Sequence, residues 1–383
     1  MDADKYIEQG MMLAEMLGSI VNEKEVNTQG AAWNLLYNIA QKNNVSAMLC
    51  NYVPKTCPEN IRYKFLNDYK KSLILVTKLD YIFDRVCDSF KKENIEFLPL
   101  KGKILRNIYP QPYMRTSCDT DIYIRENDRE SAKKCLYSLG FSLNSCGDGV
   151  DVYFKEPVYC FEIHFMPFDG RLKNCGCFGD LLERAEYDSA CGYYRFNDND
   201  LYLYNFLHLY KHFDYAGCGI KLFLDLYILS KRLDLNFYCI NSVVENCGLT
   251  EFHETVLNLN KIFFEGESPK EKYKTLTAYI LANGNFGNGA HAFSEEIKSD
   301  KSKHKFVFFL KQWFLSTEQM KPLYPILEKA PFLLPFCWIH KGVRTLFRNP
   351  SAIKREIKKV KFYSKDNCDK FDYIKSLAGI KEE

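Results

Sequence analysis

The sequence shows no long hydrophobic run, no secretory-signal pattern in its first residues and no strong net charge, and each absence argues against a class of protein. Residues 331–339, the longest apolar candidate, span about half of the roughly 20 residues that a membrane-crossing helix needs. Residues 1–5 lack the basic and then apolar pattern of a secretory signal. The formal net charge of +3 gives no global electrostatic reason for nucleic-acid binding.

A repeating cysteine framework is also missing, although the chain has 15 cysteines. Scattered cysteines are typical of a reducing compartment in which they stay thiols, so we expect a cytoplasmic protein. Cys175 and Cys177 form the one close pair, and no second pair at zinc-ligand spacing accompanies them. The sequence therefore does not predict a structural zinc site.

Apolar residues, by contrast, are plentiful. With 383 residues, of which 46% are hydrophobic, the chain can form two or three packed units. Apolar residues at helical spacing predict helices through the first 90 residues and again from residue 199. We expect an N-terminal helical region at 1–90, a β-containing core at 91–198, a C-terminal helical region at 199–363 and a loosely ordered tail at 364–383.

Residues 95–124 carry the most informative pattern. A short apolar run at 95–100 ends in Lys101-Gly102, and apolar residues then recur at helical spacing over 104–109. Residues 119–124 alternate acidic and apolar side chains. The pattern predicts a strand, a glycine turn, a helix and an acidic strand, in that order.

The acidic strand carries a pair of carboxylates. Asp119 and Asp121 project from one face, because successive side chains of a strand alternate. Two carboxylates so close repel one another unless a cation lies between them. Oxygen ligands suit Mg²⁺, and two ions roughly 3.5 to 4 Å apart can hold both oxygens of a phosphoryl displacement. The pair predicts metal-dependent nucleotidyl transfer; solvated acids at a strand end are the competing interpretation.

A further acid follows on a strand predicted at 158–166. Glu162 and His164 are two residues apart and so share a strand face. If that face meets the face of Asp119 and Asp121, Glu162 completes a carboxylate triad, as a metal ligand or as the general base. His164 contacts a phosphate, tunes Glu162 or only fills space.

Cations near the turn are candidate phosphate ligands. Lys101 lies at the Gly102 turn, where backbone N–H groups and a cation can converge on a phosphate. Arg115 lies four residues before Asp119. Its guanidinium either braces a carboxylate, contacts a phosphate oxygen or is solvated in a loop.

Together these motifs resemble a known family. The run L-K-G, a helix, then Y-P-x-P-x-x-R-x-x-x-D-x-D-I-x-I over 100–124, followed by Leu139-Gly140-Phe141 and Phe161-Glu162-Ile163-His164-Phe165, is similar to the uncharacterised nucleotidyltransferase family of bacteria. That family belongs to the DNA polymerase beta-like nucleotidyltransferase superfamily. The resemblance implies an α+β fold, a small mixed-sheet core between helical N- and C-terminal parts, with Mg²⁺ on Asp119, Asp121 and Glu162 and an NTP as substrate.

One position departs from the superfamily, which usually has Gly-Ser or Gly-Gly at the turn. This chain has Gly102-Lys103, so a hydroxyl that would contact the triphosphate is missing. Either Lys101 or Lys103 replaces it, or triphosphate binding is weak or lost.

The family also has a leucine-histidine helix followed by a Leu-Asp-Leu helix. Here the resemblance implies that Lys211 or His212 faces the nucleotide and that Asp225 holds helix positions together. His208 lies four residues before His212 and so on the same helix face. Structural packing of both histidines is the competing interpretation.

The predicted reaction transfers a nucleoside monophosphate from an NTP to an acceptor and releases pyrophosphate. The acceptor stays open between a small molecule, a protein and tRNA. The alternative is a non-catalytic module that binds a nucleotide or a partner; a kinase-like phosphoryl transferase is a third possibility. Residues 301–383 hold 18 Lys and Arg against 8 Asp and Glu, so the last helices are a solvated basic face or contact an anionic polymer or a membrane surface.

Overall fold

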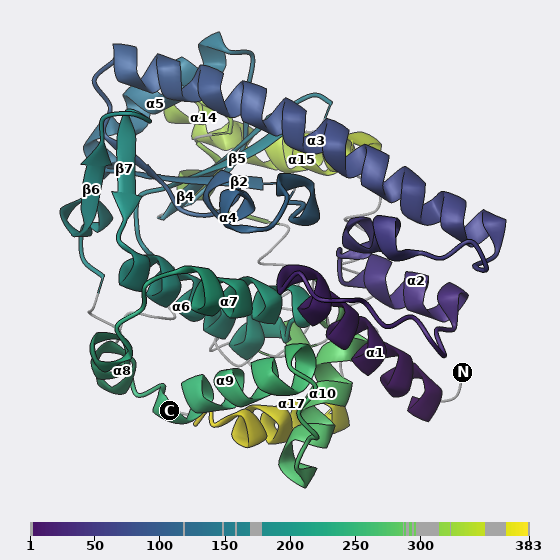
Figure 1. Ribbon diagram of the computed structural model, residues 1–383. Coiled ribbons are helices and arrows are strands. Elements are labelled where there is room, and N and C mark those ends of the chain that lie inside the picture. Colours follow the sequence, from purple (N-terminus) through teal and green to yellow (C-terminus); the bar gives the residue numbers. More distant parts are fainter. Residues whose placement is uncertain are drawn as a thin grey trace.

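The computed structural model of the protein describes residues 3–117, 119–147, 149–157, 159–168, 178–285, 287–288, 291–292, 295, 314–321, 323–348 and 365–381. Within them, a five-stranded sheet lies between a long helix on one side and a layer of helices on the other (Figure 1). The expected α+β class, with a small mixed sheet and helical parts before and after it in the chain, is confirmed.

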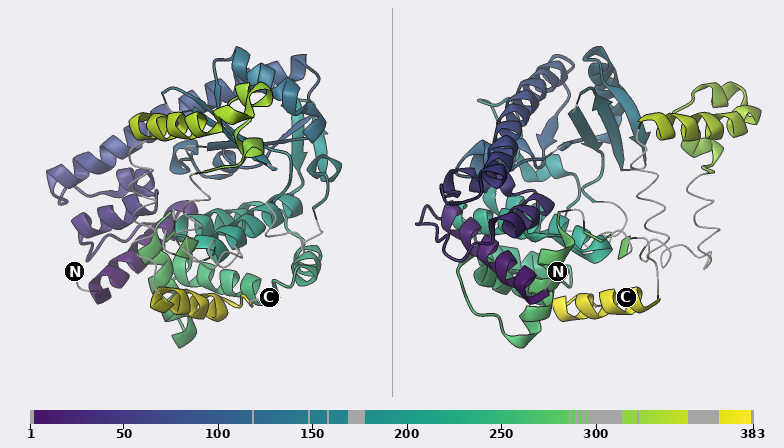
Figure 2. Two further views of the ribbon diagram at one scale, coloured as in Figure 1. Left: turned by 180° about the vertical axis from the view of Figure 1, so that it is seen from behind. Right: turned by 90° about the vertical axis from the view of Figure 1, so that its right-hand side faces the viewer.

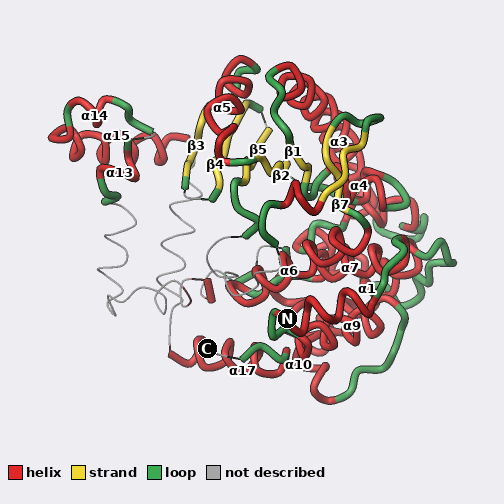
Figure 3. The backbone as a smooth tube through the Cα atoms, turned by 90° about the vertical axis from the view of Figure 1, so that its left-hand side faces the viewer, coloured by secondary structure: helices red, strands yellow, loops and turns green. Residues whose placement is uncertain are grey.

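The main sheet has the strand order β1-β2-β5-β4-β3 (Figure 3). β2 and β5 are parallel neighbours at its centre, and the other neighbouring pairs are antiparallel. The strands are β1 (Phe97–Pro99), β2 (Asp119–Ile124), β3 (Ser142–Cys146), β4 (Val150–Lys155) and β5 (Tyr159–His164). Because parallel strands need a crossover, the chain passes through helix α5 (Arg129–Ser138) and the β3-β4 pair before it returns as β5.

The register of β2 and β5 separates polar from apolar side chains. Asp121 lies opposite Glu162, and Ile122 lies opposite Ile163. Since strand side chains alternate, the acids share one face of the sheet and the isoleucines share the other. Both isoleucines are buried in the core.

The apolar face of the sheet packs against α3 (Glu59–Lys92), which crosses above the strands in Figure 1. The ring centroids of Phe90 in α3 and Phe97 in β1 lie 5.4 Å apart. α5 lies on the same side, and the short helix α4 (Lys103–Ile108) connects β1 to β2. With this face covered, the acidic face is left for the candidate site.

The acidic face turns toward a layer of helices, in which α6 and α7 lie next to the sheet (Figure 1). The first helix of the chain belongs to this layer. A Cβ on Gly18 of α1 would lie only 2.2 Å from the carbonyl oxygen of Phe264 in α9, so glycine is required for this close approach. The helices are α1 (Ala3–Val21), α2 (Trp33–Lys42), α6 (Asp198–Ala216), α7 (Ile220–Arg232), α8 (Phe237–Asn246), α9 (Thr250–Phe264), α10 (Glu271–Asn283) and α17 (Lys365–Ala378).

Three further helices form a small unit that projects from the rest of the protein (Figure 2). They are α13 (Thr317–Met320), α14 (Ile326–Lys329) and α15 (Leu334–Arg348). Met320, Leu327 and Cys337 form a hydrophobic cluster of their own, separate from the main core. The described residues of this unit therefore pack on one another.

The last described residues correct one expectation. Residues 365–378 form α17, whereas a loosely ordered tail was expected. Phe371, Ile374 and Ala378 recur at helical spacing and are buried, because α10 and α9 offer an apolar surface to them. The expectation of a loosely ordered tail was wrong. The segment has few apolar residues among many charged ones, and those few are buried only because other helices pack against them.

A second sheet was not predicted. β6 (Ala185–Asp188) and β7 (Tyr193–Phe196) form an antiparallel hairpin, which packs beside β1. The ring centroids of Tyr193 and Phe97 lie 5.8 Å apart. The hairpin therefore extends the apolar packing at the edge of the main sheet.

Some expectations lie outside the described residues, namely those on Cys175, Cys177 and most of the basic stretch after residue 348. The cysteines that are described are free thiols, which agrees with the expectation from their scatter. In the described part of the chain, no helix has both the length and the apolar character to cross a membrane.

Candidate active site

The centre of the candidate site is a cluster of three side chains from β2 and β5. The ligand-type atoms of Asp121, Glu162 and His164 all lie within 4.8 Å of one another. His164 Nε2 is 3.2 Å from Asp121 Oδ1 and 3.7 Å from Glu162 Oε2. The cluster follows from the strand register, which sets Asp121 beside Glu162 with His164 two residues further along the same face.

Asp119 lies two residues before Asp121 and so on the same face of β2. The Asp119 carboxylate lies outside the cluster of Asp121, Glu162 and His164, but its charge affects the pKa of Glu162. Burial raises the pKa of Glu162 most, and the charges of Asp121 and then Asp119 raise it further. The three acids expected from the sequence therefore interact electrostatically on one face of the sheet.

Asp121 is only 2% exposed and still negatively charged. Burial by itself would raise its pKa. The Lys101 ammonium, 2.9 Å from Oδ1, and the His164 imidazole outweigh burial and hold the pKa of Asp121 well below its ordinary range. The surroundings thus lower the pKa of Asp121 and raise that of Glu162. Such a difference suits Asp121 to remain an anion and Glu162 to accept a proton.

Gly102 makes the turn between β1 and α4. Its φ of +60° and ψ of −105° belong to a region that residues with a side chain rarely adopt. The backbone N–H of Leu100 donates to the carbonyl oxygen of Asp121 at 3.0 Å, which ties the turn to β2. Ser117 Oγ lies beside the turn, 3.9 Å from the place that a Cβ on Gly102 would take. A hydroxyl is therefore present next to the turn, although it comes from another segment.

Two lysines flank the turn and point in different directions. Lys101 faces the carboxylates, as its contact with Asp121 shows. Lys103 Nζ lies 2.6 Å from Asp84 Oδ1 of α3 and 4.9 Å from the centre of the Phe83 ring. Lys103 is therefore committed to α3 and does not face the carboxylates.

His208 on α6 lies on the other side of Lys101 and was not among the predicted site residues. Lys101 Nζ is 3.4 Å from its Nε2 and 3.5 Å from its Nδ1. Burial, and then the charges of Lys101 and His212, hold the pKa of His208 well below its ordinary value, so its imidazole is neutral. The sequence signal was available: His208 is a polar residue on an otherwise apolar stretch of helix.

The predicted nucleotide ligands Lys211 and His212 lie on the same helix. Lys211 is partly buried and His212 is exposed. The ring centroids of His212 and His208 are 4.4 Å apart. α6 therefore brings these side chains to the region beside Lys101, and their contact with a nucleotide stays a prediction.

Tyr204, one helical turn before His208, lies over the carboxylates. Burial raises its pKa well above the ordinary value, and the charges of Asp121 and Glu162 add to this. Its ring stacks on Phe168 with centroids 5.1 Å apart. The hydroxyl is thus held protonated next to the acidic face.

Arg115 is placed differently from Lys101. Its Nε donates to Asp225 Oδ1 at 2.8 Å and its Nη2 to Asp225 Oδ2 at 3.1 Å. The Tyr109 hydroxyl donates to the same carboxylate at 2.7 Å. Burial would lower the pKa of Arg115, but the Asp225 charge more than offsets it and raises that pKa. Arg115 thus braces the Asp225 carboxylate of α7 and anchors the segment that leads into β2.

The carboxylate cluster fits a divalent cation. Asp121 and Glu162 supply oxygen atoms and His164 a nitrogen atom, all within 4.8 Å of one another. The described part of the chain offers the Glu162 carboxylate no hydrogen-bond donor, and neighbouring negative charges raise its pKa. A cation would relieve this repulsion, as it does in paired carboxylate sites.

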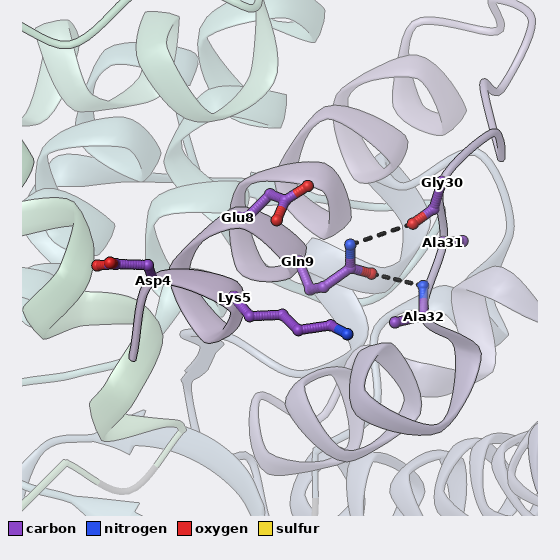
Figure 4. A pocket seen from close by; sticks show the side chains of 7 residues that line it. All are labelled: Asp4, Lys5, Glu8, Gln9, Gly30, Ala31 and Ala32. Atoms are coloured by element: carbon purple, nitrogen blue, oxygen red, sulfur yellow. Dashed lines mark hydrogen bonds between the residues drawn. The ribbon is translucent and has the colours of Figure 1, made fainter. Parts of the chain in front are cut away.

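A hollow elsewhere on the protein is lined by other residues. Residues of α1 and of the segment 30–32 line a space of about 820 Å³ (Figure 4). Gln9 bridges the two segments, donating to the Gly30 carbonyl at 3.2 Å and accepting from the Ala32 N–H at 2.7 Å. Gln9 in its wall is thus used for structure, and the hollow shares no residue with the carboxylate cluster.

The mixed sheet, the glycine turn and the acids on adjacent strands define a nucleotidyltransferase-like protein. The chain belongs to the family described as "Uncharacterised nucleotidyltransferase", which matches residues 29–265. A solution structure of the antibiotic-resistance factor ANT(2'')-Ia aligns with 49% of this chain and 97% of its own, at 9% identity and a TM-score of 0.34. No curated protein matches the chain. Family membership supports nucleotidyl transfer as the general function.

Proposed function

We propose that the protein transfers a nucleoside monophosphate from an NTP to an acceptor nucleophile in a reaction that needs a divalent metal. The observation that carries this proposal is the pairing of Asp121 with Glu162 on adjacent parallel strands, beside a glycine turn that is bonded to the same strand. Asp119, Asp121 and Glu162 would hold the metal. When bound, it stabilises the charge that develops on the phosphoryl oxygens.

The triphosphate would bind at the Gly102 turn. Lys101 would supply a positive charge there, and Ser117, whose hydroxyl donates to the Asp119 carbonyl at 3.2 Å, would supply the hydroxyl that the turn itself lacks. Arg106 of α4 lies behind the turn with only 1% exposure, and its Nε and Nη1 have no partner in the described part of the chain. Arg106 Nη2 is paired with Asp80 Oδ1 at 2.8 Å, so a polyanion at the turn would draw on the Arg106 donors that this pair leaves unused.

In the transfer step, the acceptor oxygen attacks the α-phosphorus and forms a new P–O bond. The bond from that phosphorus to the oxygen shared with the β-phosphate breaks, and its electron pair leaves with pyrophosphate. The acceptor proton would pass to the Glu162 carboxylate oxygen that does not hold the metal. Arg115 keeps the β2 segment in place through Asp225.

The test is incubation with each of the four α-³²P-labelled NTPs, alone and with cell extract, in the presence of Mg²⁺ or Mn²⁺. Wild-type protein should label an acceptor, whereas Asp119→Asn and Asp121→Asn should not. Asp88→Asn, which removes an exposed carboxylate from α3, is the matched control and should label normally. Label from γ-³²P-labelled NTP on the acceptor would instead indicate kinase-like transfer.

A non-catalytic nucleotide-binding module is the second candidate. It is favoured by Lys103, which the structure commits to Asp84 so that it does not replace the missing hydroxyl. For this candidate, nucleotide should raise the thermal stability of wild type and of Asp121→Asn alike without transfer of label. Such a result would support nucleotide binding without catalysis and contradict nucleotidyl transfer.

A further inference from the structure

His164 lies between two carboxylates. Its Nε2 is 3.2 Å from Asp121 Oδ1, within hydrogen-bonding distance, and 3.7 Å from Glu162 Oε2, which is too long for a hydrogen bond. A residue that only supported Asp121 would have no reason to face Glu162 as well. The His164 side chain is 16% exposed, so it is only partly buried.

The spacing of these atoms matches a shared ion. Adjacent ligand atoms that each lie about 2.1 Å from an octahedral ion are about 3.0 Å apart. The two His164 distances exceed this value by less than 1 Å, and all three ligand atoms lie within 4.8 Å of one another, so side-chain rotations could bring them onto one ion. Glu162 has no competing hydrogen-bond donor in the described residues that would resist this movement.

We infer that His164 is itself a metal ligand, so that the cluster takes a divalent transition ion such as Mn²⁺ in preference to Mg²⁺. The inference rests on the proposed metal-dependent function and names the ion class of the same site. Mg²⁺ binds almost only oxygen, while an imidazole nitrogen suits transition ions. Mn²⁺ accepts both donor types and keeps the coordination number that two carboxylates and a phosphate require.

Lys101 adds to this selection. Its ammonium contacts the same Oδ1 of Asp121 that faces His164. An entering ion must therefore compete with a cation already in contact with the carboxylate. An ion that gains an additional bond to nitrogen competes better than one that binds the oxygens alone.

The experiment measures Mn²⁺ bound to the full chain without nucleotide by electron paramagnetic resonance, with pulsed detection of nitrogen coupled to the ion. Wild type should show ¹⁴N coupling from imidazole and should prefer Mn²⁺ to Mg²⁺ in competition. His164→Gln, which offers an amide oxygen in place of nitrogen, should lose the coupling and weaken the preference on the order of tenfold. His340→Gln on α15 is the matched control and should retain both.

Wild-type protein grown with ¹⁵N-histidine provides the arm that needs no substitution. Its coupling should change from the ¹⁴N to the ¹⁵N pattern, which identifies a histidine even if His164→Gln folds poorly. Bound Mn²⁺ without nitrogen coupling in wild type, or coupling that persists in folded His164→Gln, overturns the inference.

The outcomes also separate this inference from the proposed function. Transfer that depends on Asp121, without nitrogen coupling, would keep the function and remove His164 as a ligand. Nitrogen coupling without nucleotidyl transfer, for any NTP or metal, would support His164 as a ligand and contradict the proposed catalytic function.

Discussion

Two aspartates of this protein are almost equally buried and yet have different surroundings. Asp121 is 2% exposed and Asp225 is 3% exposed. Asp225 accepts both arms of the Arg115 guanidinium and the hydroxyl of Tyr109. Asp121 has a single lysine contact and a histidine that also faces Glu162.

The difference shows that burial alone does not mark a functional acid. A bidentate arginine and a hydroxyl satisfy the Asp225 oxygens and leave no room for a ligand, so that pair stabilises the fold. The Asp121 cluster instead places acids close together, and burial and then the charges of Asp121 and Asp119 raise the pKa of Glu162. A cluster that keeps such repulsion is suited to an external cation.

The largest effect should come from Asp121→Asn. Loss of a metal-binding carboxylate should lower the transfer rate by roughly 10³- to 10⁴-fold, since metal ions contribute several kcal/mol of charge stabilisation. The free energy of unfolding should also fall, because the buried Lys101 ammonium loses its partner, although weaker repulsion with Glu162 offsets part of this loss. Steady-state kinetics measure the transfer rate, and urea unfolding measures the free energy of unfolding. A large loss of stability with full activity would mean that Asp121, like Asp225, serves the fold and not the reaction.

Arg115→Met should have the opposite profile. It leaves Asp225 buried without its cation, which should lower the free energy of unfolding by about 3 to 5 kcal/mol. Glu271→Gln, in an exposed pair with Lys274, should cost under about 0.5 kcal/mol as a control. Urea unfolding checks both values. Equal costs for the buried and exposed pairs would contradict the structural role of Arg115.

Acid should weaken the fold through His253 before it affects Asp121. Burial lowers the pKa of His253 to about 4. Because an unfolded histidine has a pKa near 6.5, the unfolded chain binds more protons as the pH falls, so stability is complete above pH 6.5 and declines toward pH 4, on the order of 3 kcal/mol. The depressed pKa of Asp121 gives stability that is present above about pH 3.9 and is lost only at lower pH.

Urea unfolding at pH 7 and pH 4.5 tests this difference in pH range. His253→Gln should lose less stability over that interval than wild type does. The Tyr202 hydroxyl, 3.0 Å from His253 Nε2, can still bond to the new amide. An identical decline in both proteins would mean that another group is responsible.

The smallest effect concerns the glycine turn. Gly102→Ala and Gly30→Ala each place a side chain at positive φ, so each should cost about 1 to 3 kcal/mol of stability. Only Gly102 lies beside Ser117 and the carboxylate strand. Gly102→Ala should therefore also reduce the rise in melting temperature caused by nucleotide, and Gly30→Ala should not. Thermal unfolding with and without NTP measures both, and equal effects on nucleotide binding would remove the turn from the site.

Local patterns predicted the elements of the site well. The acidic alternation marked β2 from Asp119 to Ile124, and the two-residue spacing of Glu162 and His164 placed them on one face. Both predictions depend only on the alternation of side chains along a strand. The α17 helix and the β6-β7 hairpin were missed, because their few apolar residues gain burial from distant surfaces rather than from their own pattern.

Contacts between distant segments could not be predicted from the sequence. Arg115 and Asp225 are separated by 110 residues, and Lys101 and His208 by 107. The loop arginine had three open interpretations, and the position of α7 pairs it with Asp225. His208 was recognisable as a histidine on a helix, but its approach to Lys101 depends on how α6 packs under the sheet.

The sequence by itself determined which chemical groups occur and in what order: a glycine turn, two carboxylates on one strand face and a third acid beside a histidine. Strand alternation and turn geometry are local, so neighbouring residues suffice to specify them. The tertiary structure decided the register that pairs Asp121 with Glu162, and the contacts that give Lys101 to Asp121 and Arg115 to Asp225. These depend on burial and packing between remote segments, which decide whether a charged group meets a partner or remains available for a ligand.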